Sequence, residues 1–463
     1  MSDKKDLFVE ELLNMFKQAK IDYSPLTYYY TPVTPYPRSI MTKTTTFEKG
    51  MDLTNFQVMI YIHIPFCSRR CTFCPFFSSV GKEVPQEFLL MIKKQLMQTI
   101  NLFQLPNKFN IYFGGGSPNL LSINQIKEII DCFQHKQIEE ISIEVHPEVY
   151  EKEDYFTELS KLGINRVSIG LQSSEFTILK KSDRGHDSIT LKKILLEIKK
   201  QNLLANVDVM FGGLYEETLN SAKQTFEYAF GELKPDWVTA YQTCIKTGTP
   251  EQARYLENPK KYPNTKTILK MRALRQKIAE KHGYKYLFGD YFSKNQAPKY
   301  QTKRWGSRTA VIGIGPGTHS YIIDKEIGLN WYSPFSIKNY SNLIKQNLFP
   351  AERLIKLDMK QIKAWQIIST LKTTGSVTVP ENNELLEKMT KLNLFHKNKN
   401  IYQLTEKGVL IEDLIYAVLM SLQLWKKLSA KKKEKTYSEE DARYDWFFDP
   451  DTVIKFREYL SKV

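Results

Sequence analysis

Segments with strand-like and helix-like patterns alternate between residues 58 and 240, and this alternation restricts the chain to few folds. The strand-like runs lie at residues 58–64, 110–113, 141–145, 166–169, 206–211 and 237–240. Helical patterns fall between them, at 86–103, 124–133, 151–162, 188–202 and 219–232. Alternating strands and helices predict a parallel sheet with right-handed crossovers. The six repeats predict an α/β fold, an incomplete (β/α)6 barrel with its chemistry at the carboxyl ends of the strands.

Three cysteines follow the first strand-like run: Cys67, Cys71 and Cys74, with the spacing Cys-x3-Cys-x2-Cys. Thiolates this close together on a loop suit an iron–sulfur cluster or zinc. A structural zinc site needs a fourth ligand and usually has a second Cys-x2-Cys pair, but the position where a fourth cysteine could stand is Phe76. Three ligands on a four-iron cluster leave one iron open. We therefore expect a functional cluster, with a zinc knuckle as the alternative.

The stretch that holds these cysteines, YIHIPFCSRRCTFC (residues 61–74), resembles the cluster motif of radical S-adenosylmethionine (SAM) enzymes. Its flank, Tyr-x-His-Ile-Pro-Phe-Cys, is similar to the branch of oxygen-independent coproporphyrinogen III oxidase. That branch also contains a heme chaperone, heme-degrading methyltransferases and class C methyltransferases. The resemblance implies a [4Fe-4S] cluster whose open iron is chelated by SAM. It also implies a flavodoxin- or ferredoxin-type electron donor, and cleavage of SAM to methionine and a 5′-deoxyadenosyl radical.

Polar motifs follow the other strand-like runs, and each resembles a SAM-binding segment of the same family. The run Gly-Gly-Gly-Ser-Pro at 114–118 could be only a tight turn, but it resembles a segment that contacts the SAM amino group. The resemblance carries over the SAM-binding residues Tyr61, Phe73, Gly115, Gly116, Ser117, Glu144, Gln172, Arg184 and Asp208. Because an unpaired buried carboxylate is costly, we expect a partner for Asp208, and the resemblance suggests the SAM hydroxyls or Arg184.

The same resemblance gives three candidate catalytic residues, Tyr61, Tyr241 and His319. His319 ends the glycine-rich run Gly-Ile-Gly-Pro-Gly-Thr-His, and a structural, hydrogen-bonded histidine is the alternative there. The chain departs from the family pattern at His146, where Asn is common, and at Asp183, which replaces Gly in the segment that ends at His186.

We predict three parts from these patterns. Residues 1–55 form a helix and a Tyr- and Pro-rich arm, in which prolines exclude a helix. Residues 56–345 form the barrel, and residues 346–463 form a helical domain with a basic tail. The last part resembles the winged-helix-like C-terminal domain of the family, with a two-stranded wing near residues 394–404.

Composition indicates in which compartment the protein works and which partners it could attract. No apolar run in the 463 residues reaches the length of about 20 that a membrane span needs. Five cysteines are few for this length and fit a reducing cytoplasm, so we expect a cytoplasmic protein. The net charge of +15 indicates either solvated lysine-rich faces or attraction to an anion, such as a carboxylated tetrapyrrole or a nucleic acid. We do not expect nucleic-acid binding.

The predicted reaction depends on one position at which this sequence departs from the family pattern. Coproporphyrinogen oxidases of the family carry a further cysteine where this chain has Phe76, so the resemblance favours the heme-degrading and methyl-transferring members. It implies that one SAM yields the radical and that a second SAM provides a methyl or methylene group to an unsaturated substrate, for which we predict a tetrapyrrole. Decarboxylation of the coproporphyrinogen oxidase type and a heme-binding chaperone on the same fold are the alternatives.

Overall fold

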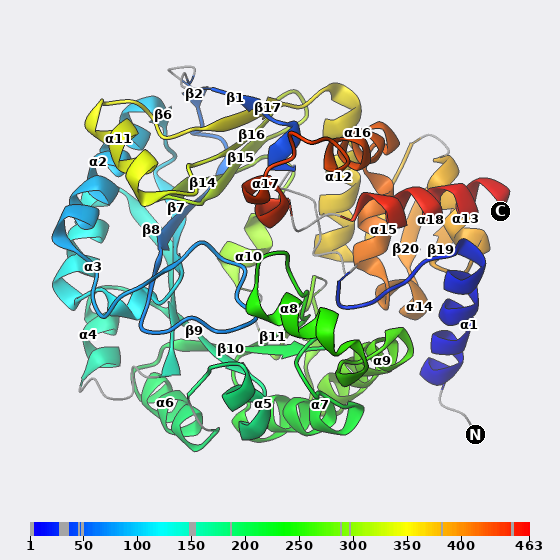
Figure 1. Ribbon diagram of the computed structural model, residues 1–463. Helices are drawn as coiled ribbons and strands as arrows, with labels where there is room; N and C mark the ends of the chain where they lie inside the picture. The colour runs from blue at the N-terminus through cyan, green and yellow to red at the C-terminus, as the bar shows by residue number, and fades with distance from the viewer. Residues whose placement is uncertain are drawn as a thin grey trace.

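The structure is a computed structural model that describes residues 4–26, 37–44, 47, 51–147, 154–185, 188–287, 289–295, 298–380, 383–445 and 449–463. Most of the predicted Tyr- and Pro-rich arm, and His186, lie outside the described residues. A large curved sheet forms one side of the molecule, and the C-terminal helices lie beside it together with α1 (Lys4–Ala19) (Figure 1). Among the described helices, none is both long enough and apolar enough to cross a membrane.

The main sheet has 13 strands, and its centre is parallel. In spatial order the strands are β1 (Thr42–Lys43), β17 (Arg353–Lys356), β16 (Gly328–Tyr332), β15 (His319–Ile323), β14 (Thr309–Ile314), β3 (Gln57–Ile64), β7 (Lys108–Gly115), β8 (Gln137–Val145), β9 (Arg166–Gln172), β10 (Leu204–Phe211), β11 (Trp237–Gln242), β13 (Tyr291–Ser293) and β12 (Lys285–Tyr286). The strands from β3 to β11 are parallel, as predicted. They form an open, partial barrel, because β11 pairs with β13 while β3 pairs on its other side with β14.

The sheet is wider than the sequence predicted. Strand β14 runs parallel to β3, and β15, β16 and β17 continue from it as antiparallel strands. Two further short pairs flank the sheet, β2 (Met51–Asp52) with β6 (Phe103–Gln104) and β4 (Phe66–Cys67) with β5 (Ser79–Val80).

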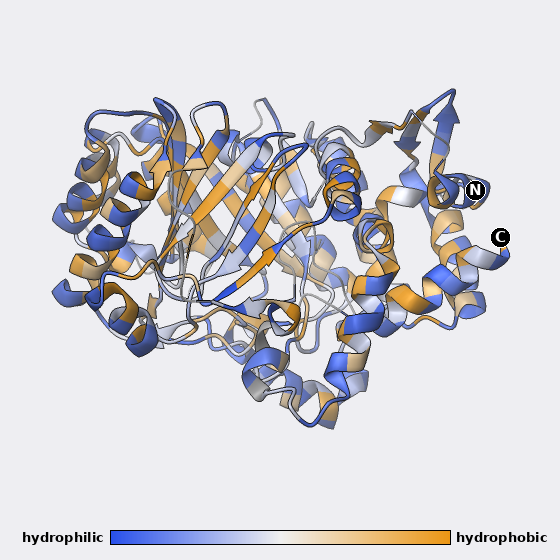
Figure 2. Cartoon of the chain, turned by 90° about the horizontal axis from the view of Figure 1, so that it is seen from above, coloured by the Kyte–Doolittle hydropathy of each residue, from blue (hydrophilic) through white to orange (hydrophobic). Residues whose placement is uncertain are grey.

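Helices cover the outer face of the barrel, and the strands alternate between that face and the interior. The covering helices are α2 (Gln86–Leu102), α3 (Ile123–Ile130), α4 (Tyr155–Lys161), α6 (Ser188–Lys200) and α7 (Leu219–Phe226). On β3, Ile60 and Ile62 belong to the core beneath these helices, whereas Met59 and Tyr61 pack with the other core of the molecule. The strands are accordingly rich in hydrophobic residues, and hydrophilic residues gather on the outer sides of the helices (Figure 2). Because successive side chains of a strand point to opposite faces, every second side chain points into the barrel.

The C-terminal part has the predicted helices and wing. Its elements are α12 (Met359–Thr374), β18 (Ser376–Thr378), α13 (Glu384–Lys391), β19 (Phe395–Asn398), β20 (Ile401–Leu404), α14 (Glu406–Val409), α15 (Glu412–Leu419), α16 (Leu422–Lys432), α17 (Glu439–Tyr444) and α18 (Pro450–Lys462). Strands β18, β20 and β19 form a three-stranded antiparallel sheet, in which the β19–β20 hairpin is the wing. Helix α1 packs against α14 and α18 of this part. The domain boundaries 1–55, 56–345 and 346–463 stay predictions.

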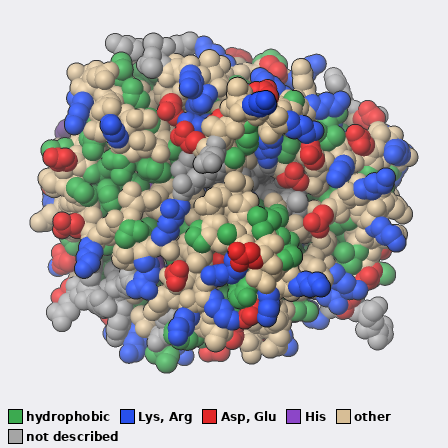
Figure 3. All heavy atoms as spheres, viewed as in Figure 1, with side chains coloured by type: hydrophobic (Ala, Val, Ile, Leu, Met, Phe, Trp, Pro, Cys, Tyr) green, Lys and Arg blue, Asp and Glu red, His purple; other side chains and the backbone are tan. Residues whose placement is uncertain are grey.

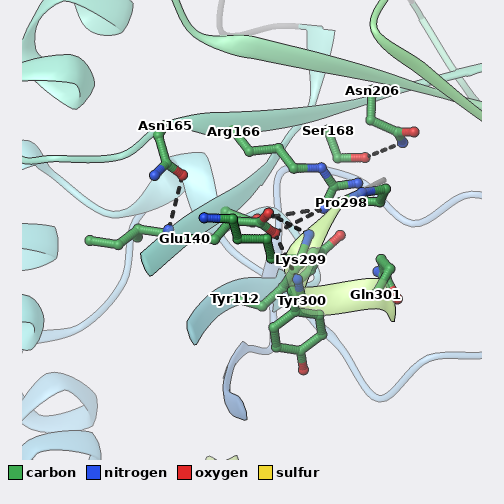
Figure 4. A network of polar contacts seen from close by, with 12 residues as sticks. Tyr112, Glu140, Asn165, Arg166, Ser168, Asn206, Pro298, Lys299, Tyr300 and Gln301 are labelled. Atoms are coloured by element: carbon green, nitrogen blue, oxygen red, sulfur yellow. Dashed lines mark hydrogen bonds and ion pairs between the residues drawn. The ribbon is translucent and has the colours of Figure 1, made fainter. Parts of the chain in front are cut away.

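The remaining described helices lie in the connections between strands of the main sheet. They are α5 (Phe176–Lys181), α8 (Pro250–Glu257), α9 (Thr265–Lys281), α10 (Lys299–Lys303) and α11 (Ile337–Lys345). Figure 4 shows how α10 is held: Glu140 on β8 accepts hydrogen bonds from the backbone N–H groups of Lys299 (2.8 Å) and Tyr300 (3.2 Å). A carboxylate suits the N-terminus of a helix, whose first N–H groups have no partner within the helix. Helix α10 therefore fills the barrel on the side nearer the amino ends of the strands.

Candidate active site

The three predicted cluster ligands lie on one loop at the carboxyl end of β3. Cys67 is in β4, and the loop through Cys71 and Cys74 returns to β5, which pairs with β4. All three thiols are free and half-buried. His63 on β3 ties the loop to the barrel, because its Nε2 lies 3.0 Å from the carbonyl oxygen of Phe77. The strand and the short β4–β5 ladder thus fix both ends of the cysteine loop.

The three thiols are compatible with the expected iron–sulfur cluster. No group of three or more His, Cys, Asp or Glu side chains in the described part of the chain is arranged to hold one metal ion. An iron–sulfur cluster does not need such convergence, because each thiolate binds a different iron. Burial raises the pKa of the Cys74 thiol to about 12 and also raises that of Cys67, where a hydrogen bond from Ser117 opposes it. Because a bound metal favours the thiolate, these protons are expected to leave when a cluster binds.

The glycine loop after β7 lies directly against the cysteine loop. The backbone N–H of Gly116 donates to the Ile64 carbonyl at 2.8 Å, and that of Ser117 donates to the Phe66 carbonyl at 2.7 Å. A Cβ atom at position 116 would lie 2.5 Å from the Phe66 carbonyl oxygen and 2.9 Å from the Cys67 sulfur. Gly115 has a φ of +114°. Only glycine fits this approach, so the triplet is more than a tight turn: it forms a wall beside the thiols.

Glu144, at the end of β8, holds the same loop. Its carboxylate accepts hydrogen bonds from the Gly115 N–H at 3.2 Å and from the Tyr112 hydroxyl at 2.9 Å. Burial and, to a smaller extent, the negative charge of Asp208 raise the pKa of Glu144 to about 7. The carboxyl group therefore supports the glycine loop and stands next to the predicted SAM position.

Glu144 makes stability depend on pH in a defined direction. The pKa of Glu144 is about 7 in the folded state, whereas an unfolded Glu titrates near 4.3. The folded state therefore binds this proton more tightly. The resulting stabilisation is fully present below about pH 4.3 and is lost as pH rises through 7. Without iron or SAM, the free energy of unfolding of Glu144→Gln is expected to fall less between pH 5 and 8 than that of the wild type, by about 2 kcal/mol. Urea unfolding at each pH measures this difference.

Glu139 gives the matched control. Although partial burial opposes it, hydrogen bonds from Lys108 and Lys303 hold the pKa of Glu139 at about 2, so this carboxyl group stays ionised between pH 5 and 8. Glu139→Gln should shift the free energy of unfolding by the same amount at each pH, so that its slope against pH stays that of the wild type. Parallel curves for Glu144→Gln and the wild type would show that the pKa of Glu144 is not raised.

Arg184 and Gln172 lie close together on the barrel side of β9. Arg184 Nη2 donates to the Gly170 carbonyl at 2.7 Å, and Nη1 lies 3.8 Å from the Cys71 sulfur. The Nε of Arg184 is buried and has no hydrogen-bond partner among the described residues. Gln172 has a positive φ of 64° and accepts a 3.4 Å hydrogen bond from the Tyr241 hydroxyl. A buried guanidinium beside the cysteine loop with an unused N–H group suits an anionic ligand such as the SAM carboxylate.

Asp208 has partners on its own and the neighbouring strand. Its carboxylate accepts hydrogen bonds from the Ser168 hydroxyl at 2.9 Å and from the Asn206 amide at 2.8 Å. Burial nonetheless raises its pKa. These hydrogen bonds come from β9 and β10 rather than from Arg184, and the alternative expectation, pairing with the SAM hydroxyls, stays a prediction.

Phe73 and Tyr241 complete the wall around the thiols. Phe73 is buried in a small cluster with Met210, and Cys71, Cys74 and Tyr241 pack against it. Tyr61 lies on the opposite side of the barrel, where its ring stacks on that of Tyr112 with 6.0 Å between centroids. Its hydroxyl is 3.4 Å from His63 Nδ1.

His319 is held in a structural position on β15. Its Nε2 lies 2.9 Å from the Asn330 side-chain oxygen, and its ring packs on those of Tyr332 and Tyr321. Burial lowers its pKa to about 3, so the imidazole is neutral. Two strands, β14 and β3, separate β15 from β7 in the sheet. A catalytic role for His319 therefore stays a prediction that these contacts do not favour.

Sequence reasoning gave His63 and Tyr112 no role. Each lies two residues along its strand from a residue in a motif that the sequence singled out: His63 from Tyr61, and Tyr112 from Gly114. Because strand side chains alternate between faces, the period of two was a signal that could have found them.

Comparisons with known proteins agree with this architecture and site. A model of the Radical SAM superfamily matches residues 61–229. The structure of the coproporphyrinogen III oxidase HemN from Escherichia coli covers 85% of this chain and 97% of its own, with a TM-score of 0.69 and 20% sequence identity. That likeness shows the shared fold.

Curated relatives narrow the class further. The heme chaperone HemW of Buchnera aphidicola subsp. Acyrthosiphon pisum (strain APS) is 30% identical over 275 residues, which are 58% of this chain and 71% of the relative. HemW of Bacillus subtilis (strain 168) is 24% identical over 382 residues, 78% and 98% of the two chains. The oxygen-independent coproporphyrinogen III oxidase of Synechocystis sp. is 24% identical over 387 residues, 79% and 80% of the two chains. The chain therefore belongs to the radical SAM superfamily, in the family of HemW and oxygen-independent coproporphyrinogen III oxidase.

Proposed function

We propose that this protein binds a [4Fe-4S] cluster through Cys67, Cys71 and Cys74, binds SAM beside it, and takes a heme-type tetrapyrrole as its ligand or substrate. The observation that carries the proposal is the meeting of three half-buried thiols, a glycine wall and a buried Arg184 at one end of the barrel. When bound, the reduced cluster supplies the electron that cleaves SAM. The expected cytoplasmic location and electron donor are part of the same proposal.

The chain's own residues bind and orient the two groups. The Ser117 hydroxyl, which hydrogen-bonds to Cys67, lies between the thiol and the glycine loop. Arg184 offers its buried Nε–H to the SAM carboxylate. Glu144, fixed by Gly115, accepts a hydrogen bond from the SAM amino group. The apolar packing of Phe73 excludes water from this corner.

The relatives favour a heme-binding role over methyl transfer. The relatives described above are named as heme chaperones and as a coproporphyrinogen III oxidase, and methyl transfer from a second SAM has no support among them. Phe76, where the resemblance expects a cysteine in the oxidases, argues against decarboxylation of coproporphyrinogen. We therefore rank a heme-binding radical SAM protein of the chaperone type first, and the methyl-transfer hypothesis below it.

The face in Figure 3 shows no concentration of positive charge that would suit a nucleic acid. Lys and Arg side chains are scattered among Asp and Glu on the face in Figure 3 and do not gather into one stripe. Arg38, for example, is buried and paired with Glu352 and Asp441. Binding to the phosphate backbone needs clustered cations, so we do not propose it.

One anaerobic experiment tests the proposed function. The reconstituted protein receives SAM, a reductant and heme, while heme absorbance, 5′-deoxyadenosine and S-adenosylhomocysteine are measured together. We expect one heme bound per chain and deoxyadenosine without S-adenosylhomocysteine. Both products rising with heme would support methyl transfer instead. No heme binding and no deoxyadenosine, with the cluster intact, would overturn the proposal.

A further inference from the structure

A small cavity lies away from the cysteine loop, between the barrel and the C-terminal part. It is lined by Leu287, Tyr291, Pro298, Gln301, Thr302, Trp305, Lys372 and Thr373. These residues come from β13 and the residues around it, from α10 and the turn that follows, and from the last turn of α12. Its volume of about 140 Å³ is close to that of a protein cavity that holds benzene. The cavity therefore suits a ligand of about six heavy atoms or fewer.

Lys372 is the chemically unusual member of the lining. It is only 4% exposed, and its Nζ lies 3.8 Å from the centroid of the Trp305 ring. The side chain also lies close against the backbone at Gly289, where a Cβ atom would be 2.7 Å from the lysine Cε. A long charged side chain is almost never buried so completely, so its position beside a cavity is a feature that needs a chemical explanation.

The surroundings of Lys372 favour its neutral amine. Burial, with a smaller effect of the guanidinium of Arg304, lowers its pKa to about 7, although Glu412, Asp290 and Asp413 oppose the shift. A desolvated lysine of this kind is a nucleophile toward carbonyl groups. The face of the Trp305 ring lies under the amine and forms one apolar wall of the space in which an adduct would stand.

We propose that Lys372 is a covalent site for small carbonyl compounds, at which its amine condenses with an aldehyde or ketone to form an imine. The nitrogen lone pair attacks the carbonyl carbon, and the C–O π bond breaks to give a carbinolamine. Both amine hydrogens then leave with the carbonyl oxygen as one water molecule, so no oxidant or reductant is consumed. The site is separate from Cys67, Cys71 and Cys74, and it does not depend on the proposed function.

Reductive trapping tests this site in the full-length protein. The protein is treated with propionaldehyde and cyanoborohydride, which reduces the imine to a stable secondary amine, and modified peptides are quantified by mass spectrometry. At pH 7 Lys372 is expected to be modified at least about tenfold faster than an exposed lysine such as Lys426, because a solvated ammonium group has no lone pair with which to attack. The rate at Lys372 should rise with a midpoint near pH 7. Modification of Lys372 no faster than that of Lys426 would overturn the proposal.

A comparison in urea separates the site from general reactivity. In urea the preference for Lys372 should disappear, because unfolding removes the burial. A preference that persists in urea would contradict a built site.

Discussion

Replacing Cys71 with alanine is expected to abolish cluster assembly and reduce reductive SAM cleavage by at least about 100-fold. Removal of a residue that supports a metal ligand already costs about 10- to 100-fold, and Cys71 is a proposed ligand itself. Iron and sulfide content, visible absorbance and 5′-deoxyadenosine formation measure the effect after anaerobic reconstitution.

Cys132 provides the control for this variant. It is also free and half-buried, but it follows α3, where its sulfur contacts the Glu128 carbonyl oxygen at 3.5 Å. Cys132→Ala should keep its full iron content and activity. A Cys71→Ala protein that retains four irons per chain would contradict the assignment of the cysteine loop as the cluster site.

Replacing Arg184 with methionine is expected to weaken SAM binding by about 10- to 100-fold. The guanidinium is 8% exposed and its buried Nε–H has no hydrogen-bond partner among the described residues, so a carboxylate there gains a charge-assisted hydrogen bond worth about 1.5–3 kcal/mol. Arg184→Lys keeps the charge but loses the planar fork, so its affinity for SAM should lie between those of the wild type and Arg184→Met. Equilibrium dialysis with labelled SAM measures the dissociation constants.

Lys181 serves as the charge-matched control for Arg184. It lies three residues away on α5, is exposed, and forms an ion pair with Glu216. Lys181→Met removes the same unit of charge but should leave SAM affinity within about twofold, because exposed ion pairs contribute little. If Lys181→Met and Arg184→Met weaken SAM equally, the effect is one of overall charge and Arg184 has no specific role.

The sequence by itself determined the parallel barrel strands and the cysteine loop. Both are local signals: hydrophobic periods mark the strands, and the spacing of Cys67, Cys71 and Cys74 needs no distant residue to be recognised. The placement of Gly115 and Glu144 also followed from sequence, because carboxyl ends of parallel strands meet at one end of a barrel.

Only the tertiary structure decided which side chains face one another. Asp208 meets Ser168 because the register sets Ser168 opposite Asn206 on the neighbouring strand, and no local pattern encodes register between separate strands. The same holds for β14, which joins β3 from some 250 residues later in the chain. It leads into the glycine-rich run that ends at His319, where a Cβ atom at Gly315 would lie 2.7 Å from the His63 carbonyl oxygen.

The burial of Lys372 is the clearest feature that the sequence could not predict. In a helical sequence pattern a lysine is ordinarily a solvated residue, and nothing near it in the chain indicates otherwise. Its burial arises because Trp305 and Gly289, both distant in sequence, are brought against α12 by packing between the barrel and the C-terminal part. The sequence determined local structure and the identity of the reactive groups, whereas desolvation, pKa and partners depend on non-local packing that only the folded chain creates.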